Sequence, residues 1–495
     1  MTYLLGIDLG SSSIKAALLD ARTGVSGGTA FYPKVEQPIL SPAPGFAEQD
    51  PHEWYRNLCR AVREVLAVQG VSGDEIAAVG ISYQMHGLVC VDGARQVLRP
   101  AIIWCDSRAV PYGQKALEGI GFDQCMTHML NSPGNFTAAK LAWVKANEPD
   151  LFSRIKTVLL PGDWLAMMLT GEVATTVSGL SEGVFWDFLA EAPSRPVLDW
   201  FGFAESLLAP IVPTFGIQGE LTARAASDLG LRKGTPVAYR AGDQPNNAFS
   251  LNVLAPGEIA ATAGTSGVVY GVTDARQYDP ESRVNSFAHV NHRADRPRIG
   301  VLLCINGTGI LNAWTLRMLG ISDYEEMNKL AAAADVGSGG VMVLPFGNGA
   351  ERMLGNRNPG AHIIGIDFNR HGRTELCRAV QEGVAFSLVY GMEMMRSVGL
   401  ELTTIRAAHA NMFLSDLFCD ILAGTGGARI ELYETDGALG AARGAGIGAG
   451  IYSSFEDAFA GLSKRKEVMP QPEIYAEAYG KWRQALEKTV FENVK

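Results

Sequence analysis

The sequence is poor in the cysteine patterns that mark disulfide-bonded or zinc-binding proteins. Seven cysteines are scattered over 495 residues, and no CxxC pair occurs. A disulfide framework or a zinc site needs cysteines at short, regular spacing, so neither is predicted. The opening residues MTYLLGIDLGSSSIK also lack the basic start and the long apolar core of a signal peptide. We therefore expect a protein of a reducing compartment, the cytoplasm.

Long apolar runs and runs of basic residues are absent as well. The Gly/Ala-rich stretch 437–450 is too short for a membrane span, and Arg443 interrupts it. Lys and Arg total 42 against 52 Asp and Glu, which gives a formal net charge of −10. Proteins that grip a nucleic-acid backbone usually present a basic face. We expect neither a membrane nor a nucleic acid as partner, although backbone amides, Mg²⁺ and a few cations can still hold a nucleotide.

Size and composition predict two globular domains. A chain of 495 residues exceeds one ordinary core, and 47% hydrophobic with 19% charged residues is globular composition. No low-complexity linker is present, so we expect a tight hinge near residues 240–255. The expected domains are residues 1–245, residues 246–455 and a helical tail, 456–495, that packs on either domain.

Strands alternate with helices in both halves, which predicts an α/β fold with mixed sheets. One helix start is marked by Asp50, Pro51 and Glu53, which supply a cap, a first-turn proline and a capping-box acid. The expected strands are 3–8, 14–19, 76–82, 237–241, 258–263, 268–272 and 404–408, and the other expected helices are 373–397, 411–424, 436–450 and 473–493.

Each half also contains a Gly/Ser turn between two strands, at Gly10–Ser13 and at Gly264–Gly267. The segments GSSSIKAALLDAR and GTSGVVYGVTDAR align without a gap, a weak sign of a duplicated domain. Successive backbone N–H groups and hydroxyls in such turns form an anion-binding concavity, and Asp8 at a strand end is placed to hold Mg²⁺. An ordinary hairpin turn is the alternative for each. No GxxxxGK[ST] occurs, so a P-loop is excluded.

Asp243 follows a predicted strand and opens a helix in the segment Gly242-Asp243-Gln244-Pro245. Transfer of a phosphoryl group to an alcohol needs a carboxylate that takes the proton of the acceptor hydroxyl. Asp243 suits that role, while a simple helix cap is the alternative and is favoured when the residue is judged alone.

Two further segments have the residue types of a sugar site. His86 follows a strand in QMHG, and Trp104 and Arg108 belong to WCDSR. An aromatic ring can cover the C–H face of a sugar while polar groups fix its orientation. A structural histidine and an ion pair beside a core tryptophan are the alternatives.

Together these segments resemble the FGGY carbohydrate kinases, and within them the xylulokinases. The segments GIDLGSSSIK, QMHG, RPAIIWCDSR, GDQ, AGTSG and DGALGAARGAG keep the family's order along nearly the whole chain. The resemblance implies an α/β fold of two ribonuclease-H-like (actin-like ATPase) domains, each with a mixed β-sheet flanked by helices, with the active site in the cleft between them. The implied reaction is the ATP- and Mg²⁺-dependent phosphorylation of D-xylulose to D-xylulose 5-phosphate.

The resemblance also implies roles for single residues. Asp243 would be the general base, and Asp8 would hold Mg²⁺ directly or through water. The expected sugar-binding residues are Gln84, Met85, His86, Trp104, Arg108, Gln244 and Asn246. The expected ATP-binding residues are Ser11, Ser12, Lys15, Gly264, Thr265, Gly307 and Asn411.

The chain departs from the family pattern in two places. Where relatives carry glycines before the adenine-side helix, it reads Arg406-Ala407-Ala408-His409-Ala410, and these side chains would narrow the adenine pocket. Pro245-Asn246-Asn247 stands where small residues are common, and one of these asparagines would touch sugar hydroxyls. The Arg-Glu signature of glycerol kinases is absent, which favours a longer sugar.

Two alternative functions stay open. The acceptor is another ketose or a sugar acid, such as ribulose or gluconate, or the chain is an actin-like nucleotide switch without a sugar. A switch protein would need neither a base at Asp243 nor the QMHG and WCDSR segments. The sequence leaves the oligomeric state open, a homodimer included.

Overall fold

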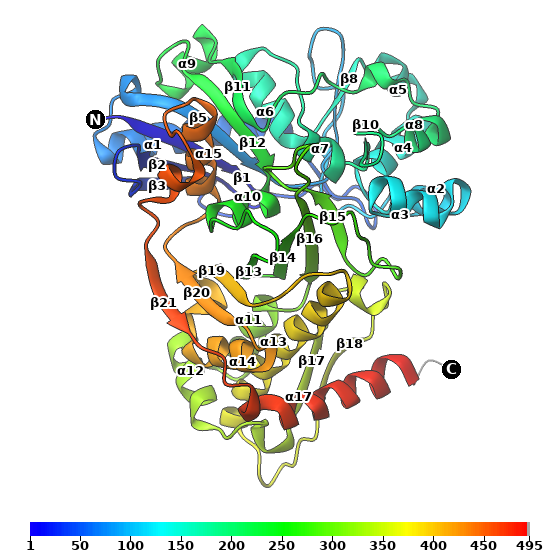
Figure 1. Ribbon diagram of the computed structural model, residues 1–495, viewed down its shortest axis with the longest axis vertical. Helices are drawn as coiled ribbons and strands as arrows, with labels where there is room; N and C mark the ends of the chain where they lie inside the picture. The colour runs from blue at the N-terminus through cyan, green and yellow to red at the C-terminus, as the bar shows by residue number, and fades with distance from the viewer. Residues whose placement is uncertain (493–495) are drawn as a thin grey trace. The chain divides into compact units, whose positions relative to one another are not determined.

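The computed structural model describes residues 1–492, which form two compact units (Figure 1). Unit 1 comprises residues 1–252, 287–299 and 435–462. Unit 2 comprises residues 253–286, 300–434 and the segment from 463 onwards. The division differs from the consecutive domains expected from the sequence, because two segments of the second half return to unit 1.

The sheet of unit 1 is mixed. Strands β12, β5 and β1 are parallel, and β11, β2 and β3 are antiparallel to their neighbours. In the order of the sheet the strands are β11 (Phe215–Glu220), β12 (Pro236–Gly242), β5 (Ile76–Tyr83), β1 (Tyr3–Leu9), β2 (Ile14–Asp20) and β3 (Ser26–Tyr32).

Helix α15 (Gly437–Gly448) packs on one face of this sheet through two glycines that are neighbours on β1 and β5. A Cβ atom on Gly6 would lie 1.7 Å from the carbonyl oxygen of Ala438. One on Gly80 would lie 2.0 Å from the carbonyl oxygen of Ala441. Only glycine therefore allows the helix backbone to lie directly on the strands.

Helix α1 (Pro51–Gln69) covers the other face. Side chains alternate along a strand, so Leu5 and Ile7 point away from the face of Gly6 and share a core with α1. The predicted start of α1 is confirmed, because the Asp50 side chain accepts a hydrogen bond from the His52 N–H at 2.9 Å. The buried residues of its apolar face include Trp54, Leu58, Val62 and Leu66.

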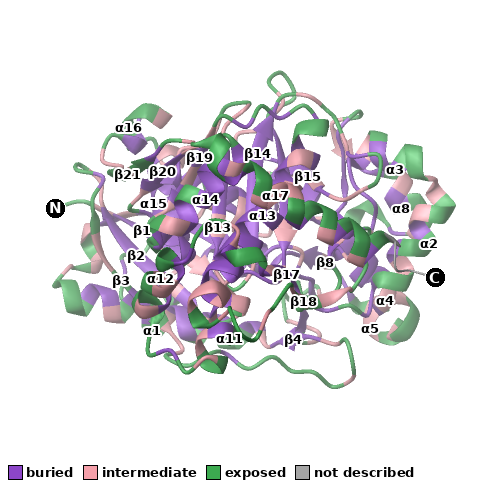
Figure 2. Ribbon diagram, turned by 90° about the horizontal axis from the view of Figure 1, so that it is seen from below, coloured by how far each residue is buried: buried purple, intermediate pink, exposed green. Residues whose placement is uncertain are grey.

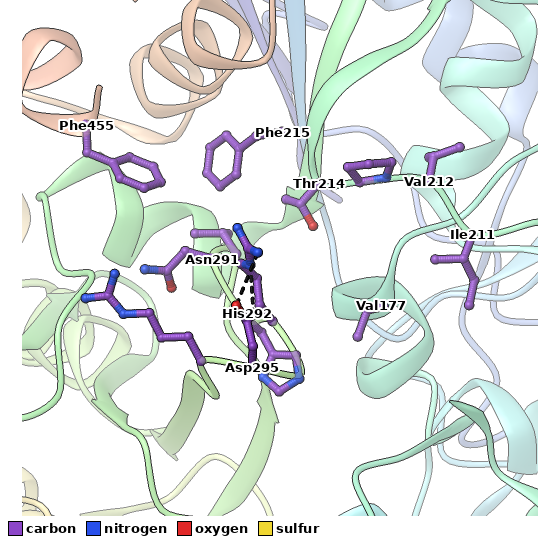
Figure 3. Close-up of a pocket in the computed structure, with 13 residues that line it drawn as sticks. Val177, Ile211, Val212, Thr214, Phe215, Asn291, His292, Asp295 and Phe455 are labelled. Carbon is purple, nitrogen blue, oxygen red and sulfur yellow. Dashed lines mark hydrogen bonds and ion pairs between the residues drawn. The ribbon is translucent and has the colours of Figure 1, made fainter. Parts of the chain in front are cut away.

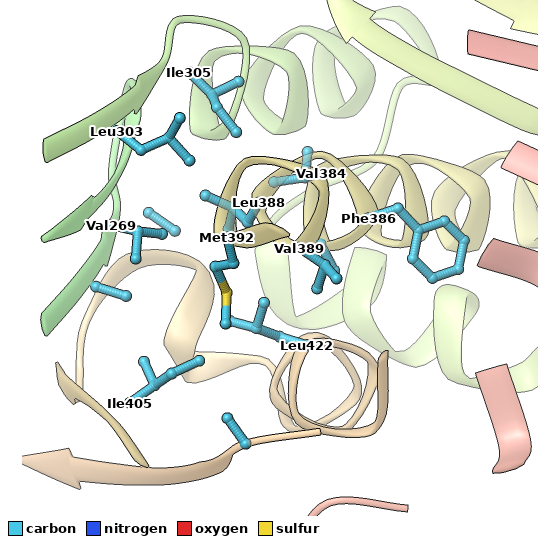
Figure 4. Close-up of a cluster of buried hydrophobic side chains, with 14 of the residues drawn as sticks. Val269, Leu303, Ile305, Val384, Phe386, Leu388, Val389, Met392, Ile405 and Leu422 are labelled. Atoms are coloured by element: carbon cyan, nitrogen blue, oxygen red, sulfur yellow. The ribbon is translucent and has the colours of Figure 1, made fainter. Parts of the chain in front are cut away.

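The sheet of unit 2 is mixed as well and has seven strands. In sheet order they are β15 (Asn285–Ala288), β16 (Ile299–Ile305), β14 (Gly267–Thr273), β13 (Ile259–Ala263), β19 (Thr404–Ala408), β20 (Arg429–Tyr433) and β21 (Lys464–Val468). The long helix α13 (Arg373–Ser397) has the predicted bounds and supplies Leu388 and Met392 to the core (Figure 4). Leu303 of β16 and Ile405 of β19 belong to the same core. The two-domain α/β fold with mixed sheets flanked by helices is thus confirmed.

The central strands of the two sheets are buried, whereas the edge strands β3 and β21 are largely exposed or half-buried (Figure 2). Shorter elements complete both units. In unit 1 they are α2 (Val110–Ile120), α3 (Phe122–Met129), α4 (Thr137–Asn147), α5 (Pro149–Arg154), α6 (Pro161–Thr170), α7 (Val177–Glu182), α8 (Arg195–Phe201), α9 (Ala223–Leu229), α10 (Asp243–Ser250), α16 (Phe455–Phe459), β4 (Glu48–Gln49), β6 (Val89–Val91), β7 (Ala101–Ile102), β8 (Thr157–Leu159), β9 (Trp186–Asp187) and β10 (Ala192–Pro193). In unit 2 they are α11 (Gly309–Met318), α12 (Tyr324–Ala333), α14 (Asp416–Gly426), α17 (Pro472–Leu486), β17 (Met342–Phe346) and β18 (Gly360–Ile364). Across residues 1–492, every helix falls short, in length or in apolar content, of what a bilayer crossing requires.

Two predicted helices differ in detail from the structure. The segment expected as one helix over 411–424 starts with a 3-10 turn, after which Ser415 caps α14 by accepting from the Phe418 N–H. The expected tail is divided, because residues 456–462 belong to unit 1 and β21 joins the sheet of unit 2. Within unit 2, Trp482 of α17 donates to the carbonyl oxygen of Val343 at 2.8 Å. The last residue of the predicted helix, Asn493, lies outside the described residues.

The contact between α15 and the sheet predicts a strong effect of a single methyl group. Gly80→Ala should lower the free energy of unfolding by at least about 2 kcal/mol, because helix and strand must separate to admit the new Cβ atom. Gly93→Ala is the matched control, since its Cβ would meet nothing within 4 Å. The midpoints of urea unfolding measure both, and equal midpoints for the two variants would contradict the close packing.

Candidate active site

Three parallel strands of unit 1 end at the same edge of the sheet. The last residues of β1, β5 and β12 are paired in register, with Tyr83 opposite both Leu9 and Gly242. Because the strands are parallel, the segments that follow them leave the sheet side by side. The structure therefore brings together the Gly/Ser turn after β1, the QMHG segment after β5 and Asp243 after β12.

A group of carboxylates lies at this edge. Asp8 is on β1, and Asp436 caps α15, where its Oδ2 atom lies 3.2 Å from the Nζ atom of Lys15. Burial raises the pKa of Asp8, and the charge of Asp436 raises it further, while Lys15 lowers it. The lysine thus offsets part of the repulsion between the two carboxylates.

Asp243 opens helix α10 at the same edge. Burial and, next, the negative charge of Asp8 raise the pKa of Asp243 to about 7, and a hydrogen bond from the Gln244 side chain opposes the shift. A carboxyl group whose pKa lies near neutrality is suited to take a proton from an alcohol at neutral pH. Gln244 therefore contacts Asp243, the candidate base.

The first Gly/Ser turn is held by side chains from several parts of unit 1. The carbonyl oxygen of Ser11 accepts a hydrogen bond from Gln49 Nε2 at 2.7 Å, and that of Ser12 accepts from the Gln37 N–H at 2.7 Å. The exposed indole of Trp104 donates from Nε1 to Ser11 Oγ at 3.4 Å. The structure thus brings Trp104 of the predicted sugar site next to the predicted phosphate turn.

His86 adopts an unusual backbone conformation, with φ at 61°. Its Nδ1 atom lies 2.9 Å from the carbonyl oxygen of Glu182. Since a carbonyl can only accept, Nδ1 carries the proton. The imidazole also packs on the rings of Phe136 and Phe287, at centroid distances of 4.7 and 5.3 Å. This ring is therefore fixed in both position and tautomer.

Two neighbours of His86 were also predicted to bind sugar. Gln84 is buried and donates from Nε2 to Gln49 Oε1 at 3.2 Å, so it supports the residue that holds the Ser11 turn. Met85 is buried against the backbone of Gly242.

Two predicted sugar residues are engaged elsewhere in the structure. Arg108 is buried in ion pairs with Asp106 and Glu48, both at 2.7 Å. Asn246 is fully buried and donates from Nδ2 to the carbonyl oxygen of Gly437 at 2.8 Å. Neither geometry supports the prediction of direct contact with a ligand, because the guanidinium and amide N–H groups serve the fold of unit 1.

In unit 2 the predicted nucleotide residues lie close together. Thr308 donates from Oγ1 to the carbonyl oxygens of Gly264 and Thr265 at 3.1 and 3.3 Å, so the start of α11 supports the second turn. Asn411 Nδ2 lies 3.6 Å from the position of a Cβ atom on Gly264. Residue 307 has to be a glycine, because a Cβ atom there would lie 1.6 Å from the Pro345 carbonyl oxygen.

Unit 2 also contains a pocket of about 560 Å³ next to α11. Its lining consists of Gly307, Ile310, Leu311, Trp314, Thr315, Arg317, Met318, Leu319, Val343, Pro345, Gly347, Asn348, Ala361, Ile363, Leu376 and Val380. The atypical segment 406–410 does not line it, so the expected narrowing does not affect this pocket. Arg406 instead forms ion pairs with Glu258 and Glu431 at 3.2 and 3.3 Å.

Unit 1 contains a pocket of about 870 Å³ whose lining includes none of Asp8, Asp243 and Asp436 (Figure 3). It is lined by Val177, Ile211, Val212, Pro213, Thr214, Phe215, Val290, Asn291, His292, Arg293, Asp295, Arg296 and Phe455. None of the predicted site residues is among them, so volume alone does not identify the chemistry of this unit.

The donor atoms near Asp8 fit a magnesium ion. Asp8 Oδ2 and Asn247 Oδ1 lie 2.7 and 3.0 Å from the position of a Cβ atom on Gly437, so two oxygens face the same small space. Mg²⁺ is usually held by one or two carboxylates together with water and substrate phosphates. Within residues 1–492, no group of three or more His, Cys, Asp or Glu side chains is placed to hold a metal ion.

The sequence analysis missed two acidic residues of this edge. Asp436 opens the DGALGAARGAG segment, and an Asp before a helix of small residues was an available signal for a cap. Glu182 ends the short helix α7 and interacts electrostatically with Asp243. No motif marks Glu182, and only the fold brings it to the site.

Two family models match the chain. The N-terminal domain model of the FGGY family of carbohydrate kinases matches residues 3–250, and the C-terminal domain model matches residues 259–449. The xylulose kinase of Escherichia coli is 29% identical, with 95% of each chain covered. The L-xylulose/3-keto-L-gulonate kinase of the same organism is 30% identical, with 92% of this chain and 90% of the relative covered.

A solved structure gives the same result. A crystal structure of a Brucella ovis kinase, titled a xyloylose kinase, is 28% identical, has a TM-score of 0.85 and covers 98% of both chains. The resemblance seen in the six sequence segments is thereby confirmed, and so is a phosphotransferase activity on a carbohydrate. The chain belongs to the FGGY family of carbohydrate kinases.

Proposed function

We propose that the chain uses ATP to phosphorylate D-xylulose to D-xylulose 5-phosphate. The observation that carries the proposal is Asp243, whose pKa is raised to about 7 at the strand edge where Asp8 and the QMHG segment also lie. The names of the relatives support the choice of sugar, since several of them are xylulose kinases. The active site between the two domains, which the family resemblance implies, stays a prediction.

In the proposed reaction, Asp243 accepts the proton of the terminal hydroxyl of the sugar. The hydroxyl oxygen forms a bond to the terminal phosphorus of ATP, and the bond between that phosphorus and the bridging oxygen breaks to release ADP. The ionised Asp243 takes the proton, and the residues that hold the sugar keep its hydroxyl in position for attack. Proton transfer and positioning are the main contributions that a protein makes to this chemistry.

Charge on the transferring group has to be neutralised. Asp8, with Asn247 nearby, would hold Mg²⁺, which neutralises phosphate charge when bound. Lys15 and the hydroxyls of Ser11 and Ser12 would face the phosphates from unit 1. The turn at Gly264–Gly267 would supply backbone N–H groups from unit 2, with Gly307 and Asn411 toward the base of the nucleotide.

The sugar would lie along the segments that follow β5 and β12. His86 and Met85 would contact it, Gln244 would lie beside the base, and the exposed ring of Trp104 would cover an apolar face. Arg108 and Asn246 are left out of this proposal, because their donor groups are occupied by the protein. A relative named for L-xylulose and 3-keto-L-gulonate supports testing other ketoses as the second candidate.

Replacement of the base should abolish turnover without unfolding the chain. For Asp243→Asn we expect kcat to fall by about 1,000-fold, because an amide cannot take the proton of the acceptor hydroxyl. A coupled assay of ADP release measures the change, and circular dichroism checks the fold. The exposed Asp123→Asn is the control and should keep normal turnover, whereas turnover near the wild-type rate in Asp243→Asn would refute the role of the base.

The raised pKa of Asp243 predicts a pH dependence. A carboxylate acts as a base only when ionised, so kcat/KM for the sugar should fall as the pH drops below about 7 and level off above it. An unperturbed carboxylate would remain ionised down to about pH 4. Initial rates between pH 5 and 9 test this, and a flat profile over that range would contradict the assignment.

A substrate panel tests the sugar itself. With Mg-ATP we expect kcat/KM for D-xylulose to exceed that for L-xylulose, D-ribulose, L-ribulose, gluconate and glycerol by at least about tenfold, because a missing or inverted hydroxyl leaves buried polar groups unpaired. A blank without sugar is the control. If another sugar is preferred, the proposed kinase activity stands but D-xylulose is not its substrate. If ATP is hydrolysed equally without any sugar, the chain is better explained as a nucleotide switch.

A further inference from the structure

Glu182 is a buried carboxylate that contacts His86 in two ways. Only 1% of the residue's surface is exposed. Its Oε1 atom accepts a hydrogen bond from the His86 N–H at 3.4 Å, and its backbone carbonyl accepts from His86 Nδ1 at 2.9 Å. Glu182 therefore holds both the backbone and the ring of a predicted sugar-binding residue.

The second carboxylate oxygen of Glu182 lies beside the segment that carries the base. Its Oε2 atom is 2.3 Å from the position that a Cβ atom on Gly242 would take, and Gly242 directly precedes Asp243. Burial raises the pKa of Glu182 well above its usual value, and the charge of Asp243 raises it further. The two carboxyl groups are thus coupled, and the Glu182 carboxyl adjoins the backbone of Gly242 and His86 at the ends of two adjacent strands.

This second oxygen makes no hydrogen bond of ordinary geometry within residues 1–492. The hydroxyl of Tyr83 acts on the Glu182 carboxyl as a weak hydrogen-bond donor that lowers its pKa, and this hydroxyl likewise makes no hydrogen bond of ordinary geometry in the described part of the chain. A buried polar atom without a partner costs about 1–3 kcal/mol. Another buried carboxylate of unit 1, Asp163, has the guanidinium of Arg240 at 2.9 Å. The fold therefore bears a cost at Glu182 that a ligand can remove.

We propose that Glu182 is a specificity-determining residue of the sugar site, whose Oε2 atom binds the sugar hydroxyl next to the one that Asp243 deprotonates. The inference rests on the proposed phosphorylation of a ketose at this site. For D-xylulose the hydroxyl is the one on C4, since C5 is phosphorylated. A hydroxyl can donate to a carboxylate or accept from a carboxylic acid, so it satisfies Glu182 in either protonation state.

The wild-type enzyme provides the first test. It should prefer D-xylulose to 4-deoxy-D-xylulose by about 100-fold or more in kcat/KM, because the deoxy sugar leaves a buried oxygen unpaired. Equal kcat/KM for the two sugars would overturn the inference even without a variant. ADP release with none of the ketoses would instead refute the proposed function, and the inference with it.

Two variants then assign the discrimination to this side chain. Glu182→Met keeps length and volume without polar atoms, and should lower kcat/KM for D-xylulose until the two sugars differ by less than about tenfold. Glu182→Gln keeps an oxygen for the His86 N–H and an amide for the sugar hydroxyl, so it should restore most of the preference. Ser181→Ala is the matched control on the same helix, because its buried hydroxyl bonds only to the backbone of Ser178 and Ala288.

A purely structural role gives a different pattern. If Glu182 acts only by holding His86, Glu182→Met should reduce kcat/KM for both sugars equally and leave their ratio unchanged. That result would refute direct recognition, while phosphorylation of D-xylulose by the wild type would still stand. A ratio that collapses in Glu182→Met and persists in Ser181→Ala supports the inference.

Discussion

The direct contact of α15 with the sheet of unit 1 is the constraint on which the candidate site depends. Gly6 and Gly80 leave no side chain between helix and strands, so the start of the helix reaches the edge where the parallel strands end. There Asp436 caps the helix through Oδ1 and lies 3.2 Å from Lys15 through Oδ2. A cap that contributes about 1 kcal/mol to the helix thereby also brings a second carboxylate next to Asp8.

This concentration of acidic groups opposes folding, and for the same reason it suits Asp243 to its proposed role as the base. Burial and like charge raise the pKa of Asp8 and of Asp243, and the charge of Lys15 offsets only part of the upward shift at Asp8. A site fully neutralised by cations from the chain would be more stable, but its carboxyl groups would ionise at their usual, lower pH and would be weaker bases. In the proposed function, a bound cation and the phosphates of a nucleotide would complete the charge compensation that Lys15 leaves unfinished.

Much of this arrangement could be predicted from the sequence, because the strand ends are local features. Asp8 and Asp243 each stand at the end of an apolar run, and parallel strands bring such ends to one edge. The surroundings of Glu182 and Arg108 could not be predicted in the same way. Glu182 meets His86 across 96 positions, and the Glu48 partner of Arg108 lies 60 positions away in the sequence. Partners at such separations leave no periodic or spacing signal.

Arg108 illustrates how a residue expected to touch a ligand can act through position instead. Its guanidinium is paired with Asp106 and covered by the ring of Phe46, whose centroid lies 3.6 Å away. Removing the guanidinium would leave the Asp106 carboxylate buried without this ion pair and cost about 3–5 kcal/mol. The same short segment presents Trp104, a residue that is 49% exposed and whose indole donates a hydrogen bond to the hydroxyl of Ser11. The WCDSR segment thus contains two parts with different roles. The buried Arg108–Asp106 ion pair is a rigid anchor, and the ring of Trp104 is exposed. The anchor holds the ring at the turn, and the ring remains exposed at the position where the proposed function has it cover a sugar.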